Sequence, residues 1–194
     1  HTELSTGVVQ VTLDSKGSAT YDIHFPSAWD FIEQHEQAKQ QVQASAVFVF
    51  GSLACRNEVT RQSVYQLLEV ANYKVFDVNL RAPHYTKEVL TYLMNQADFI
   101  KFNDDELFEI SAFLGSKYNS IEQNIQFISE QTNTKHLCVT KGSHGAVLLY
   151  DNQLYYNSGY LIKVVDTVGA GDSFLASLIH YLTHGKSPQE AIDF

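Results

Sequence analysis

Apolar and polar residues alternate along this chain in two distinct patterns. Short extended runs rich in β-branched and aromatic residues are separated by longer segments in which apolar residues recur with helical spacing. Alternation of strand and helix predicts an α/β fold, with a mostly parallel sheet and helices on both faces. From residue 46 onward, strands are predicted at 46–50, 74–78, 98–102 and 136–139, and helices at 58–70, 86–96, 105–114 and after Ser120.

Two further segments have the pattern of antiparallel hairpins, in which turn residues lie between two extended runs. The earlier one precedes the alternation of strands and helices, so we expect it to form a small separate β element. The hairpins comprise residues 8–23, with a turn at 15–17, and residues 145–156, with a turn at 151–152.

Polar residues and glycines follow each predicted parallel strand at its carboxyl end. In open α/β sheets, ligands bind outside these carboxyl ends. The pattern therefore places candidate binding residues along one edge of the sheet. They are Gly51, Ser52, Asn79, Arg81, Asn103, Glu106, Thr140 and Gly142.

The composition is that of a globular protein of 194 residues, with 44% hydrophobic and 18% charged residues. Thirteen basic against 22 acidic residues give a net charge of −9, which disfavours non-specific binding to nucleic acid or to anionic membranes. A ligand that carries phosphate must therefore be held by local groups.

No apolar run approaches the roughly 18 residues of a membrane span, and the first residues lack the layout of a signal peptide. Cys55 and Cys138 lie in apolar stretches without metal-ligand spacing, which favours buried free thiols in a reducing compartment. We expect a cytoplasmic protein.

Both ends of the chain suggest a piece of a longer protein. Ser187 and Glu190 form a capping box with Pro188 at the first helical position, yet the helix that they begin stops at Phe194. A helix of about two turns is marginal by itself, so we expect further chain beyond it.

The segment Asp166-Thr-Val-Gly-Ala-Gly-Asp172 leads directly into a helical pattern at 173–182. Its glycines allow a tight turn and close approach to a ligand, with unpaired N–H groups at the positive end of the helix dipole. Such a site suits a transferring phosphoryl group, and Asp172 would accept a proton from a substrate hydroxyl. A tight turn with a helix cap is the alternative interpretation of these residues alone.

With the flanking Asp166-Thr167, this segment resembles the Asp-Thr-x-Gly-Ala-Gly-Asp signature of the ribokinase-like (pfkB) carbohydrate kinases. The resemblance implies a three-layer α/β/α fold with a small β lid. It also implies that Asp172 is the catalytic base, that Gly169, Ala170 and Gly171 line the anion hole, and that Asp166 and Val168 bind a monovalent cation such as K⁺.

The segment Lys101-Phe-Asn-Asp-Asp-Glu106 resembles the Asn-x-x-Glu motif of the same family. The resemblance implies that Asn103 and Glu106 hold Mg²⁺ through water, and that both residues and Lys101 contribute to binding the ATP phosphates. An amide and a carboxylate suit a hydrated hard cation. A simple helix start, capped by Asn103 or Asp104, is the alternative.

Two more segments resemble family motifs in the expected order. Residues 139–145 resemble the nucleotide loop, which implies ATP-phosphate binding by Thr140, Gly142 and Gly145. Residues 77–81 resemble an Asp-x-Asn-x-Arg segment of fructokinases and sugar-acid kinases, which places Asn79 and Arg81 near the substrate or the transferred phosphate. A guanidinium suits this role, although Arg81 is otherwise a surface cation.

Together the motifs imply an ATP-dependent kinase that phosphorylates a primary hydroxyl of a small sugar, with fructose favoured. A ketodeoxygluconate or other pfkB-type sugar kinase is an alternative, and a non-catalytic nucleotide-binding member of the fold is another. We expect residues 1–25 to be part of the lid and residues 26–194 to be the ATP-binding and catalytic domain, truncated at both ends. By themselves these residues should show little activity. Lid strands often mediate dimers in this family, so a homodimer is a further expectation.

Overall fold

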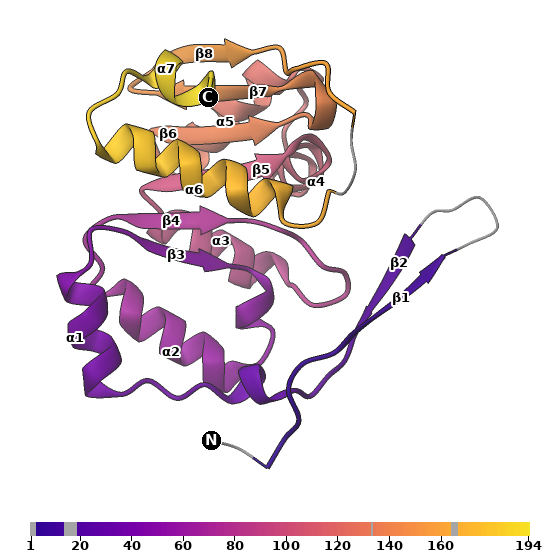
Figure 1. Ribbon diagram of the computed structural model, residues 1–194, viewed down its shortest axis with the longest axis vertical. Coiled ribbons are helices and arrows are strands. Elements are labelled where there is room, and N and C mark those ends of the chain that lie inside the picture. The colour runs from indigo at the N-terminus through magenta and orange to yellow at the C-terminus, as the bar shows by residue number, and fades with distance from the viewer. Residues whose placement is uncertain (1–2, 14–18, 133, 164–166) are drawn as a thin grey trace.

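The computed structural model describes residues 3–13, 19–132, 134–163 and 167–194, with only the backbone for residues 12, 13 and 19–21. Its centre is a six-stranded sheet in the order β3-β4-β5-β6-β7-β8 (Figure 1). β3 to β6 are parallel, whereas β7 and β8 are antiparallel to their neighbours, which confirms the predicted α/β fold. The strands are β3 (Phe48–Gly51), β4 (Lys74–Asp77), β5 (Phe99–Asn103), β6 (His136–Thr140), β7 (Ala146–Tyr150) and β8 (Gln153–Asn157).

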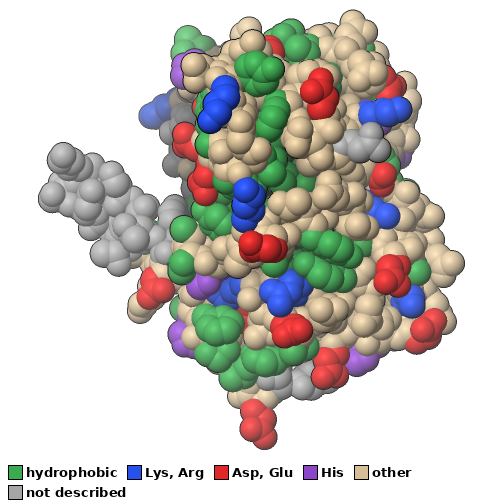
Figure 2. Space-filling model, turned by 180° about the vertical axis from the view of Figure 1, so that it is seen from behind, with side chains coloured by type: hydrophobic (Ala, Val, Ile, Leu, Met, Phe, Trp, Pro, Cys, Tyr) green, Lys and Arg blue, Asp and Glu red, His purple; other side chains and the backbone are tan. Residues whose placement is uncertain are grey.

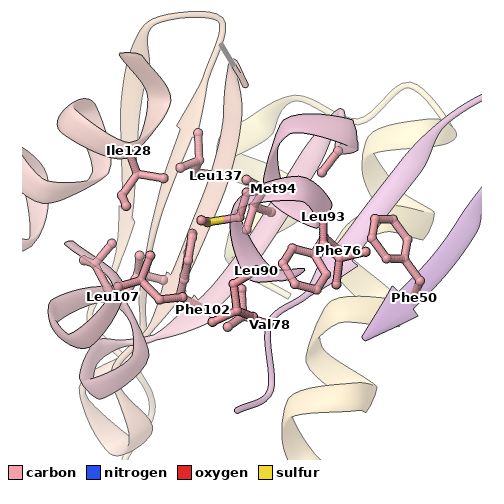
Figure 3. Packing of buried hydrophobic residues seen from close by; sticks show 14 of the residues in the cluster. Phe50, Phe76, Val78, Leu90, Leu93, Met94, Phe102, Leu107, Ile128 and Leu137 are labelled. Carbon is pink, nitrogen blue, oxygen red and sulfur yellow. The ribbon is translucent and has the colours of Figure 1, made fainter. Parts of the chain in front are cut away.

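One face of the sheet is covered by the helices that connect its parallel strands. Because each parallel strand lies beside the next one in the chain, right-handed crossovers place all of these helices on the same side. Apolar residues of the helices and strands form the larger core there (Figure 3). The helices are α2 (Glu58–Leu68), α3 (Lys87–Gln96), α4 (Asp104–Leu114) and α5 (Ile121–Thr132).

The opposite face is covered by α6 (Ala170–Thr183) and α7 (Pro188–Ile192), which follow the last strand (Figure 1). Successive strand residues point to opposite faces, so Phe76 packs in the larger core and its neighbour Val75 packs under α6 and α7. Helices on both faces make three layers, as predicted. None of the helices in the described part of the chain is long and apolar enough to cross a membrane.

Two helical segments precede the sheet, α1 (Glu36–Ala44) and the short 3₁₀ helix η1 (Ala28–Phe31). The apolar pattern did not predict α1, and the structure gives the reason, because none of its residues is buried. Two more 3₁₀ turns follow strands, η2 (Leu53–Cys55) after β3 and η3 (Gly142–His144) after β6.

A two-stranded antiparallel hairpin, β1 (Val9–Leu13) and β2 (Ala19–Ile23), projects from the body of the molecule (Figure 1). Val9 pairs with Ile23, and the turn predicted at residues 15–17 lies outside the described residues. The hairpin confirms the small separate β element, whereas the domain boundary at residue 25 stays a prediction.

Both cysteines are free and buried, as their apolar surroundings indicate. Burial raises the pKa of the Cys55 thiol and of the Cys138 thiol to about 12. Neither thiol is therefore ionised near neutral pH, which fits a packing role.

On the face shown in Figure 2, acidic and basic side chains are interspersed, without a large patch of one sign.

Candidate active site

The strand register brings the predicted motif residues to one edge of the sheet. Asp77, the last residue of β4, lies between Gly51 on β3 and Lys101 on β5. Asn103, at the end of β5, pairs with Thr140 at the end of β6. Residues from motifs far apart in the sequence thus end at the same level, as expected for the carboxyl ends of parallel strands.

The glycine segment forms the N-terminus of α6. Gly169 caps the helix in a left-handed conformation, with φ 75°, and the Ala170 N–H donates to the Thr167 carbonyl at 3.1 Å. Among the described residues, the N–H groups of Gly171 and Asp172 have no acceptor. Asp172, the third residue of the helix, is exposed. An exposed carboxylate and two N–H groups without an acceptor therefore lie at the positive end of the helix dipole.

A buried ion pair lies between this first turn of α6 and the sheet. The Lys101 ammonium is 3.2 Å from Asp77 Oδ1, and the two residues are only 6% and 7% exposed. A Cβ atom placed on Gly171 would lie 3.2 Å from Lys101 Nζ, which is tighter than an ordinary contact. Burial raises the pKa of Asp77, against the opposing effect of the Lys101 charge. The ammonium predicted to bind phosphate thus faces Asp77 and the backbone at Gly171, which is predicted to line the anion hole.

Asn103 and Glu106 form a complete capping box at the start of α4. The Glu106 N–H donates to Asn103 Oδ1 and the Asn103 N–H donates to Glu106 Oε2, both at 2.8 Å. The other carboxylate oxygen, Oε1, accepts from the Leu80 N–H at 2.9 Å. Burial raises the pKa of Glu106, although the two N–H bonds act in the opposite direction. Glu106 therefore joins the loop after β4 to the end of β5.

The loop after β4 holds Asn79 in a left-handed conformation, with φ 38°. Positive φ is uncommon outside glycine, and it clusters at sites where the surroundings impose it. Glu106 fixes the next residue through the Leu80 N–H, and the Ser52 hydroxyl donates to the Val78 carbonyl at 2.6 Å. Arg81 is exposed, so its guanidinium is accessible from solvent.

The loop after β6 has a structural requirement for glycine at Gly145. Its φ is 79°, and an added Cβ would lie 2.1 Å from the Asn157 carbonyl oxygen. The Lys141 N–H closes the loop on the Gly145 carbonyl, whereas Gly142, with φ 55°, has open space around it. The Thr140 hydroxyl donates to the Phe102 carbonyl at 3.3 Å. Gly145 is thus explained by chain packing, and Gly142 is the open glycine of the loop.

The predicted monovalent-cation site is described in part. Val168 is 83% exposed next to the glycine segment, while Asp166 lies outside the described residues. Within the described ranges, no group of three His, Cys, Asp or Glu side chains is placed to hold a metal ion.

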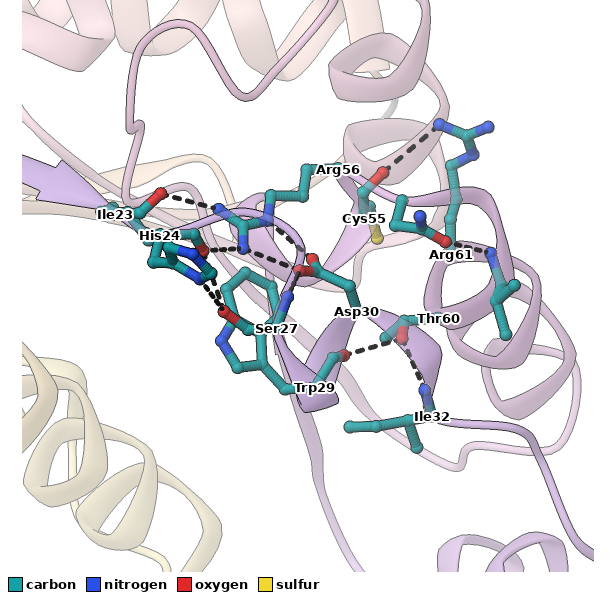
Figure 4. A network of polar contacts seen from close by, with 12 residues as sticks. Ile23, His24, Ser27, Trp29, Asp30, Ile32, Cys55, Arg56, Thr60 and Arg61 are labelled. Carbon is teal, nitrogen blue, oxygen red and sulfur yellow. Dashed lines mark hydrogen bonds and ion pairs between the residues drawn. The ribbon is translucent and has the colours of Figure 1, made fainter. Parts of the chain in front are cut away.

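The sequence did not reveal the polar network at the base of the hairpin (Figure 4). Arg56 Nε lies 2.6 Å from Asp30 Oδ1, and its guanidinium lies 3.9 Å from the centre of the Trp29 ring. Asp30 Oδ2 also accepts from the Ser27 N–H, and Arg56 donates to the His24 carbonyl. The Arg56 and Asp30 side chains are 2% and 0% exposed. This network joins the end of β2 to the segment after β3, and only the spacing of Ser27 and Asp30 hints at it.

The whole chain, residues 1–194, matches the family described as pfkB family carbohydrate kinase. The chain belongs to this family. It is 28% identical over 191 residues to a fructokinase of Vibrio alginolyticus, covering 93% of this chain and 60% of that protein. The chain thus spans less than two thirds of the length of that relative.

Solved kinase structures share the fold. A fructokinase from Vibrio cholerae O395, with fructose, ADP and calcium bound, superimposes with a TM-score of 0.78 at 24% identity, covering 99% of this chain and 65% of that one. A ribokinase from Thermotoga maritima gives a TM-score of 0.78 at 22% identity, covering 98% of this chain and 61% of that one. The predicted ribokinase-like fold is confirmed.

Proposed function

We propose that the protein is an ATP-dependent sugar kinase that phosphorylates a primary hydroxyl of fructose. The observation that carries the proposal is the exposed carboxylate of Asp172 beside the open N–H groups of Gly171 and Asp172. Phosphoryl transfer to an alcohol needs a group that takes the proton and donors that stabilise the phosphoryl charge. Membership of the pfkB family and similarity to a fructokinase with bound fructose and ADP support the proposal.

In the proposed reaction, the acceptor hydroxyl donates a hydrogen bond to Asp172. The new oxygen–phosphorus bond forms as Asp172 takes the proton, and the bond from the γ-phosphorus to the bridging oxygen breaks, with its electron pair leaving on ADP. The Gly171 and Asp172 N–H groups stabilise the phosphoryl oxygens, while Gly169 and Ala170 shape the turn. Because such transition states are commonly loose, positioning matters more than the strength of the base.

Asn103 and Glu106 fit the role of holding hydrated magnesium beside the ATP phosphates. Each Glu106 oxygen accepts one N–H bond and keeps a further lone pair, and the Asn103 side-chain amide nitrogen has no acceptor among the described residues. Water-mediated contacts of this kind are typical for magnesium. The bound ion would supply positive charge to the phosphate oxygens. Asp166 and Val168 remain the proposed site for a monovalent cation.

ATP phosphates would also contact the loop after β6, at Thr140, Gly142 and Gly145. The open space around Gly142 supports an approach by a ligand there. Asn79 and Arg81 are proposed to face the sugar or the transferred phosphate, and the exposed guanidinium of Arg81 suits this role.

A cytoplasmic location and a homodimer through the hairpin belong to the same proposal. Val9 and Val11 lie on one face of β1 and are 51% and 56% exposed. Burial of such side chains against a second copy would remove apolar surface from water.

A coupled assay of ADP release, run on the full natural protein with fructose, ribose and ketodeoxygluconate, tests the proposal. We expect turnover with fructose, and a fall in kcat of about 10²–10⁴-fold for Asp172→Asn. Asp151→Asn is the matched control, because this exposed aspartate lies in the turn between β7 and β8, at the opposite edge of the sheet. Residues 1–194 alone should turn over little sugar.

Other outcomes separate the alternatives. Preference for ketodeoxygluconate would identify a sugar-acid kinase with the same chemistry. ATP binding without turnover on any sugar would favour a non-catalytic nucleotide-binding protein. Wild-type turnover by Asp172→Asn would overturn the assigned mechanism.

A further inference from the structure

Lys101 occupies an unusual place for a charged side chain. Along β5 the side chains alternate between faces, so Phe99 and Lys101 point toward α6 while Ile100 points into the larger core. On the neighbouring strand, Asp77 points toward the same side and meets the Lys101 ammonium at 3.2 Å. The ion pair is therefore enclosed between the sheet and the first turn of α6.

The ammonium is the end of this pair that faces the first turn of α6. Among the described residues, and apart from the chain neighbours of Gly171 and the backbone of its own helix, only Lys101 Nζ lies within 4 Å of a Cβ built on Gly171. Asp77 lies farther from that point, so the positive end of the pair faces the turn. Glycine at position 171 allows this approach, because a larger residue would press on the ammonium.

Stability alone does not explain a buried ion pair at this place. Removing two charges from water costs about as much as their attraction returns, and apolar pairs of similar size are often as stable or more so. The negative charge of Asp172 is also felt at Asp77, which places the pair within electrostatic range of the proposed base. Lys101 thus pairs with Asp77 and lies beside the backbone that would stabilise the transferring phosphoryl group.

We propose that Lys101 is a positioning residue for phosphoryl transfer. Held by Asp77, its ammonium fixes the Gly171 segment from the side of the sheet and adds positive charge beside the open N–H groups. The inference rests on the proposed function and replaces direct phosphate binding by Lys101 with an action through the backbone. It assigns Asp77 the role of holding the lysine in place.

Two variants separate this role from a structural one. Lys101→Met should lower kcat about 10–100-fold, while KM for ATP and for the sugar stays within about threefold. It should also lower the melting temperature, because Asp77 is left buried without its partner. The double variant Lys101→Met/Asp77→Leu removes both charges, so we expect its melting temperature to recover and its kcat to stay low.

The matched control is Lys74→Met, the same substitution at the opposite end of β4, which should leave kcat unchanged. Recovery of both kcat and melting temperature in the double variant would show that the pair is structural and overturn the inference. Unchanged kcat in Lys101→Met would overturn it as well.

A binding measurement decides the inference independently of sugar turnover. ADP with magnesium and aluminium fluoride mimics the transferring phosphoryl group, and its affinity is read from the rise in melting temperature. We expect about tenfold weaker apparent binding in Lys101→Met and in the double variant, and wild-type binding in Lys74→Met. Equal binding by all four proteins would overturn the inference. If binding weakens in Lys101→Met and in the double variant but the wild-type protein phosphorylates no sugar, only the proposed function is overturned.

Discussion

Asp172 and Glu106 occupy the same position in two helices, the third residue, at the same edge of the sheet, yet their surroundings differ completely. Glu106 is 5% exposed and accepts two backbone N–H groups, one of them from its own helix cap. Asp172 is exposed, and its neighbouring N–H groups have no acceptor among the described residues. Glu106 takes part in the capping hydrogen bonds of its helix, whereas Asp172 makes no such bond among the described residues.

The capping residue accounts for the difference. Asn103 has a side chain that accepts the Glu106 N–H, and the acid returns the bond to the Asn103 N–H. Gly169 has no side chain, so the first turn of α6 has no such partner. A glycine cap therefore keeps both the donors and the carboxylate available to a ligand, whereas a capping box uses them for stability.

Two other acids at the third helical position also accept a hydrogen bond from the N–H of their capping residue. Asp30 accepts the Ser27 N–H and the Arg56 guanidinium, and Glu190 accepts the Ser187 N–H. The Asp30 side chain is fully buried, Glu106 is 5% exposed as a whole residue, and the Glu190 side chain is 58% exposed. If burial determines how much each of these three acids stabilises the fold, replacement by the amide should cost most stability at Asp30, less at Glu106 and least at Glu190.

The largest loss is expected for Asp30→Asn, about 3–5 kcal/mol at pH 7, because the Arg56 charge is left buried without its counter-ion. Burial acts to raise the pKa of Asp30, but the Arg56 and Ser27 hydrogen bonds and the nearby positive charges leave it below its ordinary value of 3.8. The ionised form therefore stabilises the fold above that pH, and the gain is lost as pH falls through the lower folded pKa.

Urea unfolding of wild type and Asp30→Asn between pH 2 and pH 7 measures this effect. The difference in unfolding free energy should be largest near neutral pH and should shrink below about pH 4. A difference that is constant with pH would show that the charge of Asp30 does not matter. Asp22→Asn, on β2 of the projecting hairpin, is a control at which we expect little change at any pH.

An intermediate loss is expected for Glu106→Gln, about 1–3 kcal/mol, because the amide NH₂ replaces an oxygen that accepts a buried N–H. Urea unfolding at pH 7 gives the value, with Asp105→Asn on the exposed side of α4 as the control. A loss as small as that of the control would mean that the Leu80 and Asn103 bonds are readily replaced by water.

Among the three acids that accept a capping N–H, the smallest loss is expected for Glu190→Gln, because water replaces the exposed Ser187 bond. Its melting temperature should fall less than that of Glu106→Gln under the same conditions. Equal losses in the two variants would contradict burial as the deciding quantity. Asp172→Asn completes the series, since it should change stability least and turnover most.

Most of the fold follows from sequence patterns. The strand and helix order from β3 to β8 is confirmed, with boundaries shifted by one or two residues, because apolar periodicity and turn residues act locally. α1 was missed because it buries no residue and so has no apolar stripe. η1 was missed because its stability comes from Asp30 and Arg56, which lie 26 residues apart in the chain.

The candidate site was predicted in part. Asn103 illustrates this, since the motif and the helix-cap interpretation were both available, and the structure shows the cap. Gly145 was predicted from the nucleotide loop, whereas its close approach to Asn157 depends on the return of the chain after β8. The roles of these residues in binding remain predictions for the kinase assay to test.

By itself, the sequence determined the α/β order, the glycine turn before α6 and the acid at its third position, because each depends on residues that are neighbours in the chain. Only the tertiary structure decided that Asp172 stays exposed while Glu106 is buried, and that Lys101 lies next to the first turn of α6. Asp77 and Lys101 are 24 residues apart and meet because parallel strands align their carboxyl ends. Gly171 lies close to Lys101 only because α6 packs against the sheet. In the sequence, α6 is far from β4 and β5, so local patterns do not predict this proximity.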